Sequence, residues 1–125
     1  MSKLKEVFEP VTITSYHAHV YYTEKTRHRA GLIRKQIESA FTVKMGRWRD
    51  KPVGPHPQAM YQVAFESNQF GELVPWLMLH RNGLDILVHP NTGSSHKDHT
   101  ANAIWLGNKL GLCLEALDDA KEAGS

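Results

Sequence analysis

The stretch SYHAHVYY, residues 15–22, decides how the chain folds, because it has the composition of a β-strand. It is rich in aromatic and β-branched residues and ends at the polar run 23–25. Side chains alternate across a strand, so His17, His19 and Tyr21 share one face. The other face carries mostly apolar residues that suit a core: Tyr16, Ala18, Val20 and Tyr22. Two imidazoles on one face therefore need a reason other than core packing.

Helical spacing, alternation and turn residues predict the elements that follow. They are a helix from a cap at Thr23 or Thr26 to about Ser39, a strand at 40–48, a Pro- and Gly-rich loop at 49–57, a strand at 58–66, a helix at 70–83 capped by Ser67 or Asn68, and a strand at 84–90. Pro75 has to fall in the first turns of its helix or kink it. After a polar loop at 91–99, residues 100–107 are expected to begin a short last helix. Residues 110–117 are expected to form a strand or a helix, and the tail at 118–125 is expected to fray.

The order βαββαβ predicts an α+β fold of the ferredoxin-like kind. Its antiparallel sheet has four strands, with two helices on one face. The opposite face is left open, and such a face is usually covered by another chain, so we expect a homodimer. The length of 125 residues predicts a single domain over 1–125.

Composition excludes several classes of protein. The chain is 41% hydrophobic and 22% charged with a net charge of +2, as in an ordinary soluble protein. Its densest basic group, at 25–35, fits the solvated face of a helix, so no nucleic-acid partner is expected. No apolar run is long enough to span a membrane, and the start has no signal-peptide core. The one cysteine, Cys113, fits a reducing, cytoplasmic compartment and is expected to be a buried, inert thiol.

Eight dispersed histidines point to a site, because imidazole is the commonest metal ligand and acid/base group. The first and fourth strands are neighbours in the predicted sheet, so His17, His19 and His89 meet on its open face. A histidine pair spaced i, i+2 on a strand, with a third imidazole from the next strand, can hold a metal ion and leave open positions. Alternatively, Glu66 or Asp85 completes a set of two histidines and one carboxylate, or faces water.

Other residues could join this site. His56 lies in the turn GPHP, which aims one side chain, and His99 could cap the last helix or support a ligand. Trp48 could line a ring-binding pocket, and Arg47 and Arg49 beside it could pair with a substrate carboxylate. The remaining histidines are expected at the surface: His28, His80 and His96.

Four motifs together resemble the DOPA 4,5-dioxygenase family of small ring-cleaving enzymes. They are YHAHVYY, GPHP, WLMLHRNGLDILVHPNTG and KDHTANAIWLG, spread over about residues 13–107. The resemblance implies an extradiol dioxygenase that uses non-haem Fe(II) and O₂ to open a catechol such as DOPA. Another divalent metal such as zinc could occupy the same site. The motif histidines carried over from the resemblance are His17, His19, His56, His89 and His99. Among them we expect His17, His19 and His89 to bind metal, and His56 and His99 to act as acid/base or orienting groups. Tyr21, Trp48 and Arg47 are expected to bind substrate.

Two other classes of function remain open at this point. The same histidines could serve a non-catalytic metal- or ligand-binding dimer. A metal-dependent hydrolase is also compatible with the histidine pair, although it needs a carboxylate base, for which Glu66 and Asp85 are the candidates.

Overall fold

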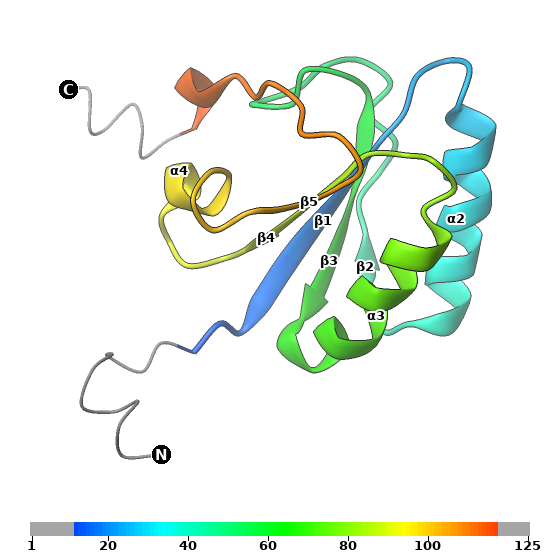
Figure 1. The fold of residues 1–125 in the computed structure, drawn as a ribbon, viewed down its shortest axis with the longest axis horizontal. Helices are drawn as coiled ribbons and strands as arrows, with labels where there is room; N and C mark the ends of the chain where they lie inside the picture. The colour runs from blue at the N-terminus through cyan, green and yellow to red at the C-terminus, as the bar shows by residue number, and fades with distance from the viewer. Residues whose placement is uncertain (1–11, 118–125) are drawn as a thin grey trace.

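A five-stranded antiparallel sheet in the order β2-β3-β1-β4-β5 organises the computed structural model (Figure 1). The structure describes residues 12–117, so the predictions for the chain start and for the tail at 118–125 lie outside it. The elements are β1 (Ser15–Tyr21), α2 (Arg27–Ala40), β2 (Lys44–Met45), β3 (Met60–Glu66), α3 (Ser67–His80), β4 (Ile86–Pro90), α4 (Ser95–Asp98), β5 (Ile104–Leu106) and the 3₁₀ turn η1 (Leu114–Ala116). The α+β class is confirmed, whereas the ferredoxin-like assignment and the dimer stay predictions.

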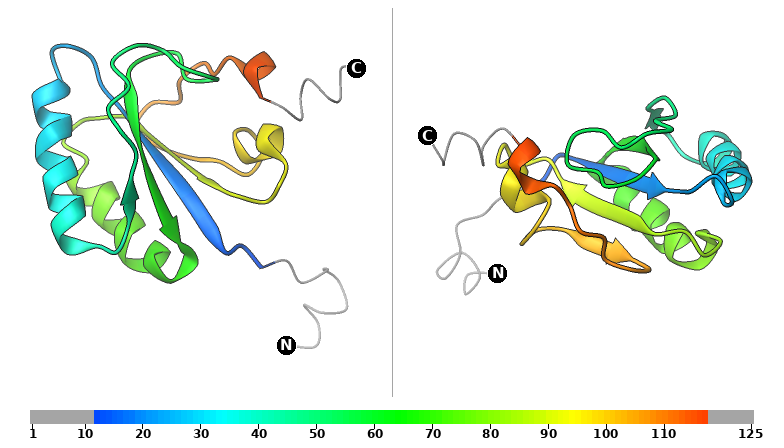
Figure 2. Two further views of the ribbon diagram at one scale, coloured as in Figure 1. Left: turned by 180° about the vertical axis from the view of Figure 1, so that it is seen from behind. Right: turned by 90° about the horizontal axis from the view of Figure 1, so that it is seen from above.

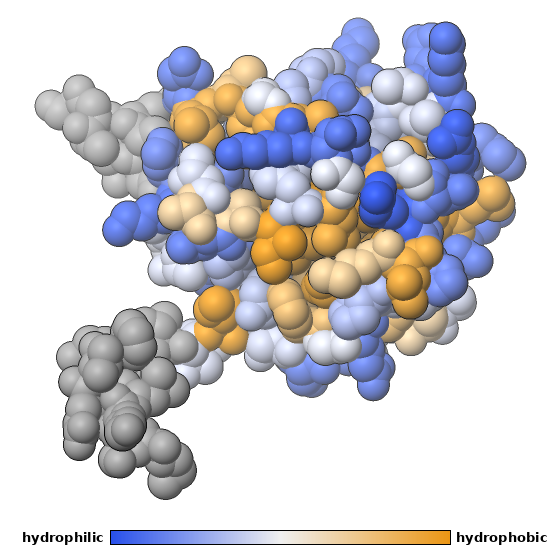
Figure 3. Space-filling view, in the orientation of Figure 1, coloured by the Kyte–Doolittle hydropathy of each residue, from blue (hydrophilic) through white to orange (hydrophobic). Residues whose placement is uncertain are grey.

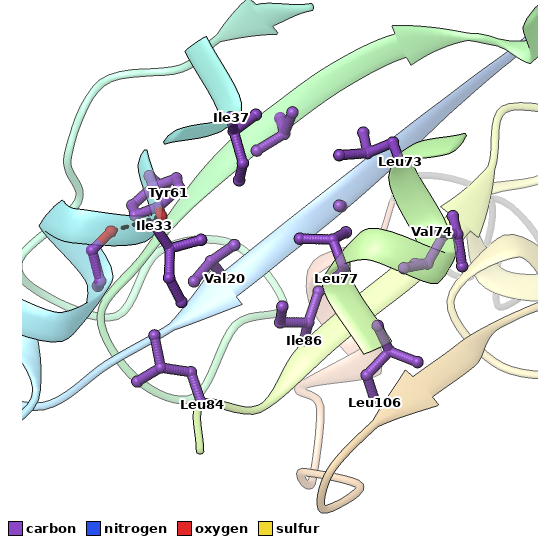
Figure 4. Close-up of a cluster of buried hydrophobic side chains, with 14 of the residues drawn as sticks. Val20, Ile33, Ile37, Tyr61, Leu73, Val74, Leu77, Leu84, Ile86 and Leu106 are labelled. Atoms are coloured by element: carbon purple, nitrogen blue, oxygen red, sulfur yellow. Dashed lines mark hydrogen bonds between the residues drawn. The ribbon is translucent and has the colours of Figure 1, made fainter. Parts of the chain in front are cut away.

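Two helices, α2 and α3, cover one face of the sheet, and α4 and η1 lie on the other side (Figures 1 and 2). The main core lies between the sheet and these two helices. Its labelled members come from α2, α3, the strands β1, β3, β4 and β5, and the turn before β4, which supplies Leu84 (Figure 4). Tyr61 is fully buried there and its hydroxyl donates to the carbonyl of Ala30 at 2.7 Å, which ties β3 to α2. The predicted alternation in β1 is confirmed, because Ala18, Val20 and Tyr22 all belong to this core.

The helix predictions differ in their accuracy. The helix α2 begins after Thr26, as expected, and extends to Ala40. The helix α3 begins at Ser67, so Ser67 and Asn68 lie inside it and Glu66 is its N-cap. Pro75 is the ninth residue of α3, beyond the first turns, and its missing N–H leaves the carbonyl four residues earlier without a helical donor. Burial of Leu73, Val74 and Leu77 in the same segment offsets the loss of this hydrogen bond.

The second strand is much shorter than the predicted 40–48. Only Lys44 and Met45 pair regularly with β3, and an isolated bridge joins Arg49 to Met60. Met45 pairs with Val63 and Arg49 pairs with Met60, so four residue spacings on this side lie opposite three on β3. One extra residue on one strand is a β-bulge. Gly46 lies in this bulge, where an added Cβ would come within 3.3 Å of β3.

The fifth strand corrects the prediction of a helix at 100–107. Ile104–Leu106 pairs with β4, opposite Val88, Leu87 and Ile86, and the short helix α4 lies instead within the segment expected to be a loop. The physical reason is the open edge of β4, whose backbone groups gain partners from β5. This long-range pairing outweighs the local preference of residues 100–107.

The chain after β5 turns back across the sheet face opposite α2 and α3. Tyr21, Met60 and Leu87 form a small second core there, with Ala103, Trp105, Leu110 and Leu112 packed against it. Cys113 in this segment is exposed, so the prediction of a buried thiol is wrong. The amide of Cys113 donates to the carbonyl of Pro55, which points the thiol outward and joins this segment to the loop between β2 and β3.

The outer surface mixes hydrophilic and apolar patches on the side drawn in Figure 3. Met78 and Leu79 at the end of α3 are 52% and 81% exposed. Across residues 12–117 no helix is both long enough and apolar enough to cross a membrane.

Candidate functional site

Five imidazoles gather on the sheet face opposite the helices, and we call them the histidine cluster. They come from β1, the loop before β3, β4 and the C-cap of α4: His17, His19, His56, His89 and His99. Strand alternation explains the first part, because His17 is paired directly with His89 across β1 and β4. His19, His56 and His89 are at most 6% exposed. Burial of so many imidazoles is costly unless the group has a ligand or a chemical task.

His19 lies at the centre of the histidine cluster. Its Nε2 is 3.0 Å from Nε2 of His89, and its ring centroid is 4.2 Å from that of His56. His99 packs beside His89, with their ring centroids 4.1 Å apart. Two overlapping groups have potential ligand atoms within 4.8 Å of one another: His17, His19 and His89, and His19, His56 and His99.

Backbone carbonyls fix the tautomers of two rings. The Nδ1 of His89 donates to the carbonyl of Pro90 at 2.9 Å, and that of His99 donates to the carbonyl of Ser95 at 2.7 Å. A carbonyl can only accept, so each Nδ1 carries the proton and each Nε2 keeps a lone pair when the ring is neutral. Such backbone hydrogen bonds are the usual means by which a metal-binding histidine is oriented.

His19 has a buried nitrogen without a partner, which tests whether the cluster fits a metal ion. Since Nε2 of His89 holds a lone pair, His19 Nε2 donates to it in the neutral cluster. The Nδ1 of His19 is then left as a buried acceptor with no hydrogen bond. A buried polar atom of this kind is rare unless an ion, a water or a substrate satisfies it. Three or more imidazole nitrogens suit Fe(II), Zn(II) and related divalent metals.

Burial lowers the pKa of four rings of the histidine cluster and favours their neutral form near pH 7: His17, His19, His56 and His89. Burial, together with a smaller effect of nearby His99, lowers the pKa of His56 and of His89 from 6.5 to about 4. Burial also holds the pKa of His19 well below 6.5, with the four neighbouring imidazoles adding to the effect. The neutral form is the one that binds a metal, so the protein supplies its ligands already deprotonated.

Tyr21 connects the cluster to the second core. Its hydroxyl lies 2.7 Å from Nδ1 of His56, and its ring stacks on Trp105 of β5 at 5.9 Å. Tyr21 is 1% exposed, and burial raises the pKa of its phenol above the usual range, so the group stays protonated. The Tyr21 hydroxyl therefore fixes the orientation of the His56 ring.

A buried carboxylate holds the loop that carries His99. Asp98 is 3% exposed and accepts hydrogen bonds from the backbone and the hydroxyl of Thr92 and from Asn102. These contacts close the chain from 92 to 102 over one end of β4. They place His99, the next residue, against the ring of His89.

A pocket of about 290 Å³ opens beside the cluster, and we call it the His19–His56 pocket. It is lined by His19, His56, Arg47, Arg49, Gly46, Val53, Gly54, Pro55, Met60 and Gln62. Trp48 is not among these residues. Its ring packs on the helix side against Tyr22 and Tyr61, with the guanidinium of Arg27 4.0 Å from its centroid.

The carboxylates proposed as alternative ligands lie elsewhere. Asp85 accepts a hydrogen bond from the amide of Asn108, at the end of β5. Glu66 is exposed and lines a separate hollow of about 490 Å³ with His17 and Lys44. Among residues 12–117, the groups able to hold a metal consist of histidines alone.

A family model described as the Dopa 4,5-dioxygenase family matches residues 16–116, a range that contains the whole histidine cluster. The chain belongs to the Dopa 4,5-dioxygenase family. A solved structure of a candidate dioxygenase from Nostoc punctiforme is 52% identical, with a TM-score of 0.84, over 86% of this chain and 94% of that one. The resemblance seen in the sequence motifs is thus confirmed.

Two curated relatives are fungal proteins. An uncharacterized 21.2 kDa protein of Botryotinia fuckeliana is 35% identical, and a DOPA 4,5-dioxygenase of Amanita muscaria is 32% identical. The matches cover 86% and 84% of this chain. They cover 66% and 50% of the two relatives, so this chain spans about two thirds and half of their lengths.

The structure brings together the five histidines that the family motifs singled out, together with Tyr21. Arg47 lines the adjacent pocket, whereas Trp48 packs in the core and is not part of the site proposed below. Trp105 lies next to the site, because its ring stacks on Tyr21. The sequence reasoning did not place Trp105 there. Its position could have been found only from the pairing of β5 with β4, which places Trp105 opposite Leu87.

Proposed function

We propose that the protein is an extradiol ring-cleaving dioxygenase that acts on a catechol, such as DOPA or a related o-diphenol, with Fe(II) and O₂. The observation that carries the proposal is the cluster of five imidazoles, whose candidate metal groups contain no carboxylate, next to an open pocket. Membership of a dioxygenase family and the name of the Amanita muscaria relative support the same reaction class.

His17, His19 and His89 are the proposed metal ligands. They come from two adjacent strands, whose hydrogen-bonded pairing holds the three rings in place without a ligand. When bound, Fe(II) would supply a binding position for the two catechol oxygens and for O₂ together, and the electron transfer between them. The second group, built from His19, His56 and His99, is the alternative ligand set.

His56 is the proposed group for moving protons. Its pKa of about 4 keeps it neutral, and its Nδ1 exchanges a hydrogen bond with the Tyr21 hydroxyl. When Tyr21 donates to Nδ1, Nε2 carries the proton and can deliver it; when Nδ1 donates to Tyr21, Nε2 can accept a catechol proton. His99 is the second candidate, because its Nδ1 is fixed by a carbonyl and its Nε2 is free to accept.

The His19–His56 pocket is the proposed place for the aromatic ring. Val53, Pro55 and Met60 supply apolar contacts, and His19 and His56 line the same space. Its volume of about 290 Å³ lies near the lower end of the range for small-molecule sites and suits a single ring with a short side chain.

A metal-dependent hydrolase is less well supported, because Asp85 is bound to the Asn108 amide and the candidate metal groups contain no carboxylate. A non-catalytic metal-binding protein would have the same histidines. Only a measurement of catalytic turnover distinguishes it from the dioxygenase.

The test is anaerobic loading with Fe(II), followed by oxygen uptake and absorbance on addition of a panel of catechols. A ring-cleaving dioxygenase consumes one O₂ per catechol and forms a yellow product. A matched control is His28→Ala, because His28 is exposed on α2, away from the cluster. Its oxygen uptake should equal that of the wild type. An iron-loaded, folded protein that consumes no oxygen with any catechol would reject the proposal.

A further inference from the structure

We infer that the His19–His56 pocket selects a catechol whose side chain ends in a carboxylate and bears no ammonium group. The inference rests on the proposed function and narrows its substrate class. It is carried by two arginines, Arg47 and Arg49, which line this pocket together with the two histidines.

Local backbone structure directs both arginines to the histidine face. Trp48, between them, packs into the core on the helix side. The backbone of Arg49 pairs with Met60, whose side chain belongs to the second core on the histidine face. Residues paired across antiparallel strands point to the same side, so Arg49 follows Met60. The bulge at Gly46 brings Arg47 to the same pocket.

Neither guanidinium is neutralised by the protein. Within residues 12–117, the ion pairs are Arg27 with Asp50 and Arg34 with Glu38, both on the helix side. Arg81 donates to the carbonyl of Leu84. Arg47, which is exposed, and Arg49, which is half-buried, have no such partner in this range. Guanidinium groups bind carboxylates through paired hydrogen bonds, so two free ones in a small pocket favour an anion.

Carboxylates that could attract an ammonium group are absent from the pocket lining. Asp50 accepts hydrogen bonds from Tyr22 and Arg27, and Asp98 accepts hydrogen bonds from Thr92 and Asn102. An ammonium group in the pocket would therefore meet two positive charges and no negative one. The expected order of binding is a catechol with a simple carboxylate side chain first, zwitterionic DOPA second and cationic dopamine last.

Binding to the metal-free protein tests the inference separately from the reaction. Titration calorimetry is carried out with 3-(3,4-dihydroxyphenyl)propionate, its methyl ester, DOPA and dopamine. The acid should bind at least about tenfold more tightly than the ester, because charge-assisted hydrogen bonds are lost with the charge. Arg47→Gln and Arg49→Gln should each reduce this preference, and the double variant should abolish it. Arg29→Gln, at an exposed arginine of α2, should leave it unchanged.

Equal binding of the acid and its ester by the wild type would overturn the inference, as would no detectable binding of either. A preference that survives in the double variant would also overturn it. Oxygen uptake in the iron-loaded protein is measured separately. Turnover without the preference rejects the inference alone, and the preference without turnover rejects the dioxygenase alone.

Discussion

Nε2 of His19 on β1 lies 3.0 Å from Nε2 of His89 on β4. Because β4 pairs with β1, the central strand of the sheet, this contact is held by backbone pairing. The carbonyl of Pro90 fixes the tautomer of His89, whereas the other nitrogen of His19 is buried without a partner. The site is therefore preorganised by backbone pairing and incomplete in its hydrogen bonding.

Replacement of His19 should remove metal binding while the fold is retained. His19 belongs to both groups of potential ligands, so His19→Gln weakens either set. Changes at groups that merely orient ligands typically cost 10–100-fold in metal affinity, and loss of a ligand should cost at least about 100-fold. The measurement is equilibrium dialysis against Fe(II) or Zn(II), with circular dichroism to check folding. Full metal occupancy in a folded His19→Gln protein would show that His19 is not a ligand. His28→Ala is the control for loss of an imidazole elsewhere.

Tyr21→Phe should reduce turnover and leave the metal content unchanged. The variant keeps the ring that stacks on Trp105 but loses the hydroxyl that holds His56. Proton transfer by a positioned side chain is typically worth about 10²–10⁴-fold, so a fall of about tenfold or more in kcat is expected when His56 loses its partner. The measurement is kcat at equal iron occupancy.

Tyr22→Phe provides the matched control, because its hydroxyl bonds Asp50 on the helix side. Both variants should lose about 1 kcal/mol of unfolding free energy, the usual value for one hydrogen bond. Tyr21→Phe and Tyr22→Phe proteins with the same kcat would show that the hydroxyl of Tyr21 has no part in the reaction.

The local sequence predicted the site better than it predicted the C-terminal third of the fold. Alternation in β1 and β4 placed His17, His19 and His89 together, because the side-chain period of a strand is a local property. The position of β5 depends on the free edge of β4, which lies about 18 residues earlier in the chain. The local propensity of residues 100–107 contains no information on that edge. Cys113 lies in the chain that follows β5, so its exposure could not be predicted either.

Gly107→Ala should destabilise the fold by disturbing the end of β5. Gly107 has φ = +88°, and an added Cβ would lie 2.5 Å from Oδ1 of Asp85 and 2.9 Å from the guanidinium of Arg81. The backbone strain alone costs of order 1–3 kcal/mol, and the displaced side chains add to it. Urea denaturation measures the change in unfolding free energy. Gly111→Ala is the control, because Gly111 has no neighbour within 4 Å and no positive φ. Equal stability of the two variants would contradict the observed geometry.

The metal-free protein should lose stability as the pH falls from about 6.5 towards 4. His56 and His89 have a pKa of about 4 when folded and the ordinary value of 6.5 when unfolded. Between these values the unfolded chain binds more protons, so the free energy of unfolding rises with pH and levels off above 6.5 with respect to these groups. A pKa shift of this size corresponds to a change of about 3 kcal/mol in the free energy of unfolding for each group. Urea denaturation at pH 5.0–7.5 measures the slope while most carboxylates stay ionised.

His56→Gln should flatten that slope, whereas His28→Ala should leave it as in the wild type, since His28 is exposed. The burial of neutral imidazoles is the physical cause of the dependence, and a bound metal should steepen it, because protons compete with the metal for the same nitrogens. A wild-type stability that does not change between pH 5.0 and 7.5 would mean that these histidines are protonated as easily in the folded state as in the unfolded one. Such a result would contradict the conclusion that these buried histidines are neutral and ready to bind a metal.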